Sequence, residues 1–306
     1  MMDVHRSSGS VRGPRYGTQR QRLFKDPLMT TPEGLRRIDI AEPDVDQADL
    51  TTNQVTAVRK ALALLAAFRG TSRHVGLSDL ARRAGLPKST AYRLLADLES
   101  AGFVEREDSM YRLGLSLFEL GARVGFNRPN GLRDIAMHDL SQLYVSTGLT
   151  VHLAVLSGNE IVYIERMQGG QPTRVLTIPG ARRAASCTAL GKAILAFSDP
   201  ADIKAVVAQG LARKTSYSII SPQRFLSELK GIRETGVAHE REESALGLFG
   251  VAAPIIVDGY AIAAVALAGP TSGVTWRSAE SRVRSAADNI ARLIVMSTNG
   301  LPPLDE

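Results

Sequence analysis

Cysteine is almost absent from this sequence, since Cys187 is the only one among 306 residues. This excludes a disulfide framework and a cysteine-rich metal site, and a reducing cytoplasm is the expected compartment. No run approaches the roughly 18 consecutive apolar residues that a transmembrane helix needs. The basic N-terminus also lacks the apolar stretch of a secretory signal. With 44% apolar residues, the chain is expected to form two globular domains plus extensions.

Acidic residues are fewer than basic ones, 31 against 37, which leaves a net charge of +6. The excess is local, because residues 51–115 hold ten basic and six acidic residues, whereas residues 130–306 hold 17 and 16. Residues 1–25 add six basic residues against one aspartate. A basic excess confined to one region is typical of a surface that contacts nucleic-acid phosphates.

Residues 77–98 have the pattern of two short helices that meet at Gly85-Leu86-Pro87. Ser78 is expected to cap the first helix, because its hydroxyl can accept a free N–H of the first turn. Gly85 can adopt the left-handed conformation that ends a helix, and Pro87 presets the backbone for the next one. Helical spacing predicts a buried stripe on the second helix, made of Ala91, Leu94, Leu95 and Leu98. The pattern as a whole predicts a helix-turn-helix.

The opposite face of the second helix is polar, and it suits the major groove of DNA. Tyr92 and Arg93 are expected to face base edges. Phosphate contacts are expected from five further residues, which are Lys88, Ser89, Thr90, Arg106 and Arg112. The alternative is an ordinary helical hairpin with a solvated charged face.

The residues around this motif complete a winged helix. Residues 103–107 and 110–114 alternate as two short strands around Asp108-Ser109, which is compatible with a hairpin turn. Val55–Phe68 keeps helical spacing and supplies a packing helix. A winged helix-turn-helix is therefore expected over residues 51–115. A linker helix, Leu115–Arg123, opens the connecting region of residues 116–131.

The rest of the chain reads as an α/β domain over residues 132–300 with a largely antiparallel sheet, so the fold class is α+β. Helices are expected over Leu132–Thr147, Thr188–Phe197, Ser221-Pro222 to Gly236, and Ser278–Met296. Strands are expected over Thr150–Leu156, Glu160–Met167, Arg174–Pro179, Val251–Val257 and Ala261–Ala268.

Residues 1–50 have few apolar residues and no periodicity, which predicts a disordered extension. Two explanations of this segment stay open. Met29 could be the true start of the protein, or the basic arm could add nonspecific affinity for DNA.

Three groups of residues resemble the IclR family of bacterial transcriptional regulators: Thr90–Leu95, the hairpin ending Tyr111-Arg112-Leu113-Gly114, and Gly191–Ala196. Residues 236–254 and 264–270 resemble the effector-domain signature and the last strand of that family. The resemblance covers about Thr52 to Thr298. It implies a winged-helix domain, a linker helix, a GAF-like effector-binding domain, dimers that pair into tetramers, and operator DNA as a partner.

The resemblance also implies an effector pocket, formed by Cys187, Thr188, Ala189, Leu190, Glu240, Gly250, Ala266 and Ala268. Family members that bind small carboxylates have a cysteine and two serines where this chain has Gly250, Ala266 and Ala268. The loss of three polar side chains favours a larger, more apolar effector over a small acid such as glyoxylate. Ser186-Cys187-Thr188 resembles the branch of the family that responds to aromatic acids, although Gly191-Lys192 departs from the Gly-Arg of that branch.

Other chemistry has weaker support. Gly191-Lys192 lacks the upstream glycine of a phosphate loop. Nothing in the sequence brings Cys187, His152 and Glu240 together as nucleophile, base and orienting acid. The histidines show no metal-ligand spacing.

The favoured function is a sequence-specific DNA-binding regulator, and foremost a repressor, whose operator binding responds to a small organic effector. The protein is expected to form a homo-oligomer. No catalysis, cofactor, metal or membrane association is expected. The alternative is an enzyme or metabolite-binding module whose helical domain merely resembles a helix-turn-helix. A gel shift with DNA upstream of the gene distinguishes these two classes.

Overall fold

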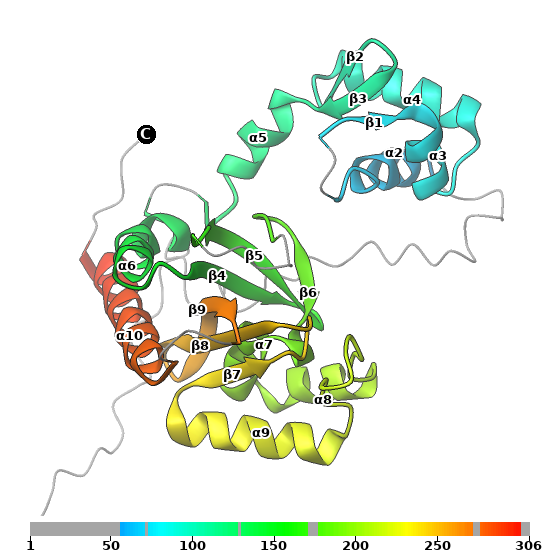
Figure 1. The fold of residues 1–306 in the computed structure, drawn as a ribbon. Coiled ribbons are helices and arrows are strands. Elements are labelled where there is room, and N and C mark those ends of the chain that lie inside the picture. The colour runs from blue at the N-terminus through cyan, green and yellow to red at the C-terminus, as the bar shows by residue number, and fades with distance from the viewer. Residues whose placement is uncertain (1–55, 71–72, 128–129, 171–176, 272–275, 301–306) are drawn as a thin grey trace, which may run out of the picture. The chain divides into compact units, whose positions relative to one another are not determined.

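The computed structural model describes residues 56–70, 73–127, 130–170, 177–271 and 276–300 (Figure 1). The extension expected over residues 1–50 lies outside these ranges. Among the described helices, none combines the length and the apolar character needed to cross a bilayer.

The first described region is a winged helix. Its helices are α2 (Ala57–Ala66), α3 (Leu77–Arg83) and α4 (Lys88–Ser100). Its strands are β1 (Val75–Gly76), β2 (Val104–Glu107) and β3 (Met110–Leu113), which form an antiparallel sheet in the order β1-β3-β2. The structure therefore confirms the predicted helix-turn-helix and hairpin. The sequence did not predict β1, because two residues are too few to show alternation.

The turn between α3 and α4 has the predicted conformation. Gly85 has a φ of 65°, and the amide of Leu86 donates to the carbonyl of Ala81 at 2.9 Å. The predicted cap at Ser78 is wrong, because the N-cap lies two residues earlier, at Gly76, which makes no side-chain bond. Pairing of β1 with β3 keeps the chain extended up to Gly76, so the helix can begin only after it.

The helices and the hairpin of this domain share one apolar core. Its most buried members are Leu64, Leu80, Ala91, Leu95 and Val104. Helix α5 (Leu115–Ala122) follows β3 and contains no buried residue. The winged helix is thus complete without α5, whose apolar side chains are left uncovered.

The second region contains a six-stranded sheet in which every neighbouring pair is antiparallel. Its strands are β4 (Thr150–Ser157), β5 (Glu160–Met167), β6 (Arg182–Ala184), β7 (Ala238–Arg241), β8 (Leu248–Val257) and β9 (Tyr260–Pro270). They lie in the order β6-β5-β4-β9-β8-β7. The last strand of the chain, β9, therefore lies in the middle of the sheet.

Helices cover both faces of this sheet (Figure 1). One face packs against α6 (Leu132–Thr147) and α10 (Trp276–Gly300). The other packs against α7 (Ala189–Ala196), α8 (Pro200–Ala208) and α9 (Pro222–Thr235). A short 3-10 turn, η2 (Ala185–Cys187), leads into α7.

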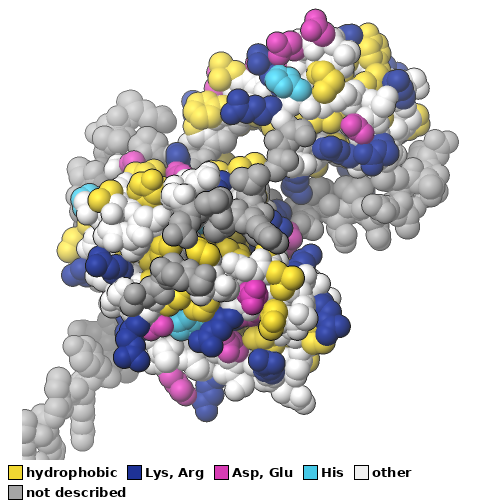
Figure 2. Space-filling view, viewed as in Figure 1, with side chains coloured by type: hydrophobic (Ala, Val, Ile, Leu, Met, Phe, Trp, Pro, Cys, Tyr) yellow, Lys and Arg dark blue, Asp and Glu magenta, His cyan; other side chains and the backbone are white. Residues whose placement is uncertain are grey.

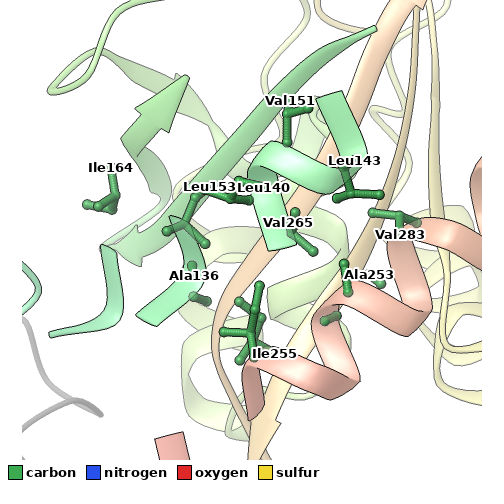
Figure 3. Close-up of a cluster of buried hydrophobic side chains, with 14 of the residues drawn as sticks. Ala136, Leu140, Leu143, Val151, Leu153, Ile164, Ala253, Ile255, Val265 and Val283 are labelled. Atoms are coloured by element: carbon green, nitrogen blue, oxygen red, sulfur yellow. The ribbon is translucent and has the colours of Figure 1, made fainter. Parts of the chain in front are cut away.

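Alternation along the strands assigns each side chain to one of these two layers. Val151, Leu153 and Val265 point toward α6 and α10, as Figure 3 shows. The residues between them, such as Ala154 and Ala266, belong to the layer that contains α7. Since successive side chains of a strand point to opposite faces, the α7 layer receives mostly small residues from β9.

The prediction of a third strand, Arg174–Pro179, is wrong for the residues that the structure describes. Residues 177–179 form no strand, residues 174–176 lie outside the described ranges, and the strand beside β5 is β6. The chain turns at Gly180, whose φ is 83° and whose amide donates to the carbonyl of Tyr163 at 2.7 Å. The sequence prediction also omitted α8 and β7.

Candidate functional site

Helix α4 presents an exposed polar face at its N-terminal end. Lys88, Ser89, Tyr92 and Arg93 are exposed, with Tyr92 at 50%, while Thr90 is half-buried. The first turn contains no acidic residue. A helix N-terminus carries partial positive charge, so this end of α4 favours contact with an anion. A phosphate backbone meets that condition.

The wing differs from α4, because its two arginines already have partners. Arg112 bonds Glu105 at 2.6 Å through Nη2 and at 2.7 Å through Nε. The Nε of Arg106 donates to the Asp108 carbonyl at 3.0 Å, and its guanidinium lies 5.8 Å from the centre of the Tyr111 ring. Acidic and basic side chains are interspersed over this domain (Figure 2). Phosphate contacts by Arg106 or Arg112 would require exchange of these bonds.

A pocket opens in the second region between the sheet and the start of α7. Its lining consists of His152, Tyr163, Thr177, Arg183, Thr188, Ala189, Leu190, Glu240, Ser244, Leu248, Gly250, Ala266, Leu267 and Ala268. The empty space measures about 470 Å³, part of it open to solvent.

Strand register explains why residues distant in sequence meet in this lining. Ala268 of β9 pairs with Gly250 of β8, and Gly250 pairs with Glu240 of β7. Two residues earlier in β9, Ala266 pairs with His152 of β4. These five residues therefore form two adjacent rows on the face of the sheet that packs against α7.

Helix α7 forms the wall opposite the sheet, and every one of its eight residues is buried. The Thr188 hydroxyl caps it by accepting from the Gly191 amide at 3.0 Å. The amides of Ala189 and Leu190 have no partner within the helix, because first-turn N–H groups point away from it. A Cβ on Gly191 would lie 2.2 Å from the Ala185 carbonyl oxygen, so only glycine permits this approach.

Glu240 is the buried carboxyl group of the pocket. Its Oε1 accepts from the Ser244 amide at 3.1 Å and from the Ser244 hydroxyl. Burial raises the pKa of Glu240 to about 7, and the nearby Glu243 raises it further, while the Ser244 bonds and Lys192 oppose the shift. At neutral pH the group therefore exists in both charge states.

His152 and Tyr163 add two neutral polar groups. Burial lowers the pKa of His152 to about 3, and the nearby Arg166 lowers it further, so the imidazole is uncharged. Its Nε2 lies 2.6 Å from the Thr177 hydroxyl. Burial also raises the pKa of Tyr163, and the Glu240 carboxyl adds to this, so the phenol stays protonated.

Arg183 supplies the cation of the lining. It lies on β6 opposite Ile161 and is exposed. Within the described part of the chain its guanidinium makes no hydrogen bond or ion pair. A guanidinium presents a planar set of donors that suits a carboxylate.

The structure brings seven of the eight expected effector residues into this one lining. The eighth, Cys187, is buried outside it, and its Sγ donates to the Ala212 carbonyl at 2.9 Å. Burial raises the pKa of this thiol. The expectation of a more apolar pocket overlooked polar groups contributed by other elements: His152, Tyr163, Thr177, Arg183 and Ser244.

Of these polar residues, His152 is the one whose position on the sheet could have been predicted from the sequence. It alternates with the apolar residues of β4, so it had to share the face of Ala154. Its place opposite Ala266 depends on the pairing of β4 with β9, which are more than 100 residues apart. That pairing cannot be derived from local patterns.

A winged helix with an exposed polar recognition helix, followed by an α/β domain with a polar pocket, defines a class of DNA-binding protein with a separate regulatory domain. The family comparisons identify it. Residues 57–108 match the IclR helix-turn-helix domain, and residues 128–295 match the bacterial transcriptional regulator IclR C-terminal domain. The chain belongs to the IclR family and is a DNA-binding transcriptional regulator.

Relatives and solved structures agree with this assignment. The chain is 34% identical over 239 residues to the HTH-type transcriptional regulator KdgR of Escherichia coli K12. The matched region covers 76% of the chain and 88% of KdgR. It is 29% identical over 223 residues to the transcriptional repressor AllR of the same organism, with 72% and 82% covered. An IclR homolog from Microbacterium hydrocarbonoxydans, solved in complex with 4-hydroxybenzoate, matches with a TM-score of 0.72 and 25% identity, covering 78% of the chain and 99% of that protein.

Proposed function

We propose that this regulator is a repressor that binds operator DNA through α4 and releases it when an organic acid occupies the pocket. The single observation that carries the effector assignment is the pocket lining, in which first-turn amides of α7, the Arg183 cation and the neutral side chains of His152 and Tyr163 converge. The repressor role follows the similarity to AllR. Because its target is chromosomal DNA, the protein acts in the cytoplasm.

The proposed ligand is an acid with an apolar or aromatic body. Its carboxylate would accept from the amides of Ala189 and Leu190, since helix N-termini favour anions. Its body would lie over Gly250, Ala266 and Ala268. A ligand hydroxyl would bond Glu240. The complex of a similar protein with 4-hydroxybenzoate supports this chemistry.

At the DNA end, Tyr92 and Arg93 are proposed to read base edges, and Lys88, Ser89 and Thr90 to hold phosphates. Arg106 and Arg112 are proposed as secondary phosphate contacts, because they must first leave their present partners.

The protein is further proposed to act as a homodimer, or as a pair of dimers. One winged helix reads only a few base pairs, so specificity requires symmetric half-sites. Both α2 and α5 expose large apolar side chains, which include Val58 (68%), Leu62 (51%), Leu115 (63%), Phe118 (72%) and Leu120 (56%). A second copy of the chain would cover these faces.

Fluorescence anisotropy with DNA from upstream of the gene tests the proposal. Binding should be tight and specific, and 4-hydroxybenzoate or a related aromatic acid should release the DNA. If no acid from an aromatic and aliphatic panel changes DNA affinity or the melting temperature, the pocket is not an organic-acid site.

A further inference from the structure

The helix that forms one wall of the pocket contains a completely buried lysine. Lys192 is in the middle of α7, and its side chain is 0% exposed. Its Nζ lies 2.6 Å from Oε1 of Glu243 and 3.2 Å from Oε1 of Glu228. None of the three residues lines the pocket. Because an ammonium group loses several kcal/mol of hydration on burial, this cation depends on its two partners.

The three charged residues come from three different elements. Lys192 follows the turn of α7 that forms one wall of the pocket. Glu243 lies just after β7, between Glu240 and Ser244, which form the facing wall. Glu228 lies on α9. The Lys192–Glu243 contact therefore connects the helix of one wall with the segment of the other, and neither residue is part of the lining.

A second set of bonds braces the same segment from outside. The Ser218 hydroxyl donates to the Glu243 carbonyl at 2.7 Å, and the Thr215 hydroxyl donates to the Glu242 carbonyl at 2.7 Å. The backbone of residues 242–243 is thus held by the loop before α9, while the Glu243 side chain is held by α7.

Stability alone does not account for this ion pair. The Oε2 atom of Glu243 is buried and makes no hydrogen bond within the described residues. Well-packed apolar side chains in place of a buried ion pair often leave stability unchanged or improve it. Net stability therefore gives no reason by itself to retain a buried charge pair that is incompletely satisfied.

We propose that Lys192 and Glu243 are positioning residues for the effector pocket, whose ion pair holds residues 240–244 against the start of α7. This inference rests on the proposed effector role of the pocket. Two charged side chains act on Glu240, Lys192 from α7 and Glu243 from its own segment. The other titratable or charged groups of the lining are His152 from β4, Tyr163 from β5 and Arg183 from β6.

The two partners act on Glu240 in opposite directions, which provides a test that needs no ligand. The positive charge of Lys192 lowers the pKa of Glu240, and the negative charge of Glu243 raises it. Lys192→Met should therefore raise that pKa and Glu243→Gln should lower it, each by more than the error of a carboxyl-carbon NMR titration. Shifts in the same direction, or no shift in either variant, would overturn the proposal.

Amide hydrogen exchange on the full-length, unliganded protein tests whether the ion pair holds residues 240–244 in place. Lys192→Met should accelerate exchange in residues 241–248 by about tenfold while β4, β5 and α10 keep their protection. Glu243→Gln retains an oxygen that accepts from Nζ, so the same segment should stay protected. Uniform loss of protection across the sheet would show that the pair merely stabilises the domain, and would refute a positioning role.

If Lys192→Met fails to fold, Glu243→Gln still decides the matter, because it preserves shape and must lower the pKa of Glu240. Ligand binding is measured separately, by calorimetry with 4-hydroxybenzoate. Because exchange and titration use no ligand, they can support the positioning role even if that acid does not bind. Conversely, binding unaffected by Lys192→Met would reject positioning and leave the proposed pocket intact.

Discussion

At the scale of single residues, the proposed ligand site makes the charge of Glu240 important. An ionised carboxylate beside the free amides of Ala189 and Leu190 competes with an anionic ligand. A protonated carboxyl group donates a hydrogen bond instead. Because burial raises the pKa of Glu240 to about 7, the choice between these states falls within the ordinary pH range of a cell.

Ligand affinity should therefore depend on pH. The dissociation constant for 4-hydroxybenzoate should rise about tenfold between about pH 6 and pH 8, as Glu240 loses its proton. The neutral amide analogue should show little change. In Glu240→Gln the pH dependence should disappear, and a tenfold change that persists in this variant would assign it to another group.

The same shift affects folding stability. The pKa of Glu240 is raised above its ordinary 4.5, so its contribution is fully present below that value and is lost as pH rises through about 7. His152 has the opposite effect, since its pKa is lowered to about 3 and its contribution is lost as pH falls below 6.5. Chemical denaturation of Glu240→Gln should show less loss of stability between pH 5 and 8 than the parent.

Arg93 offers the sharpest test of the DNA-binding helix. Arg93→Ala should weaken operator binding by about 1–3 kcal/mol and relax sequence preference, because an arginine that contacts base edges is lost. Lys230→Ala, which removes an exposed charge from α9, is the matched control. Equal affinity of Arg93→Ala and the control for operator DNA would show that α4 is placed wrongly on the duplex.

Single residues also show how far a sequence reveals a site. The positions of Glu240, Gly250 and Ala266 could be anticipated because they lie within recognisable family motifs. Arg183 could not, since it belongs to a three-residue strand whose place depends on a turn at Gly180. The ion pair of Lys192 could not be predicted either, because its partner Glu243 is 51 residues away in the sequence.

At the scale of elements, β9 sets the depth of the pocket. Ala266→Phe should fill the space between β9 and α7 and abolish release of DNA by effector, while operator binding itself stays within about twofold. Ala208→Phe, at an exposed position of α8, is the control. Normal release by Ala266→Phe at the parent's ligand concentration would place the effector elsewhere.

Elements with long periodic patterns were predicted well. Helix α6 and strand β5 have the predicted bounds, because sixteen and eight residues carry enough alternation to locate their ends. The prediction failed for β6 and for β7, which are three and four residues long. Strands β2 and β3 are just as short, but a two-residue turn joins them. Longer loops separate β6 and β7 from their partners, so no local turn pattern marks these two strands.

At the scale of the whole molecule, the exposed apolar faces of α2 and α5 predict self-association. Phe118→Glu should shift the protein toward monomer in multi-angle light scattering and weaken binding to a two-half-site operator, since a charge replaces a side chain that is 72% exposed in the single chain. Val145→Glu, at an equally apolar position of α6 that is 78% exposed, is the control. A Phe118→Glu protein with the parent's mass would exclude α5 from the interface.

The central place of β9 has a consequence for synthesis on the ribosome. Strands β4 and β8 are neighbours of β9 and not of each other, so the two halves of the sheet remain separate until residues 260–270 have left the exit tunnel. The winged helix, which is encoded earlier and closed by local contacts, can fold while that happens. A nascent chain stalled before β9 would therefore contain a folded DNA-binding domain and an incomplete sheet. Such a chain could contact an operator before its effector pocket has formed.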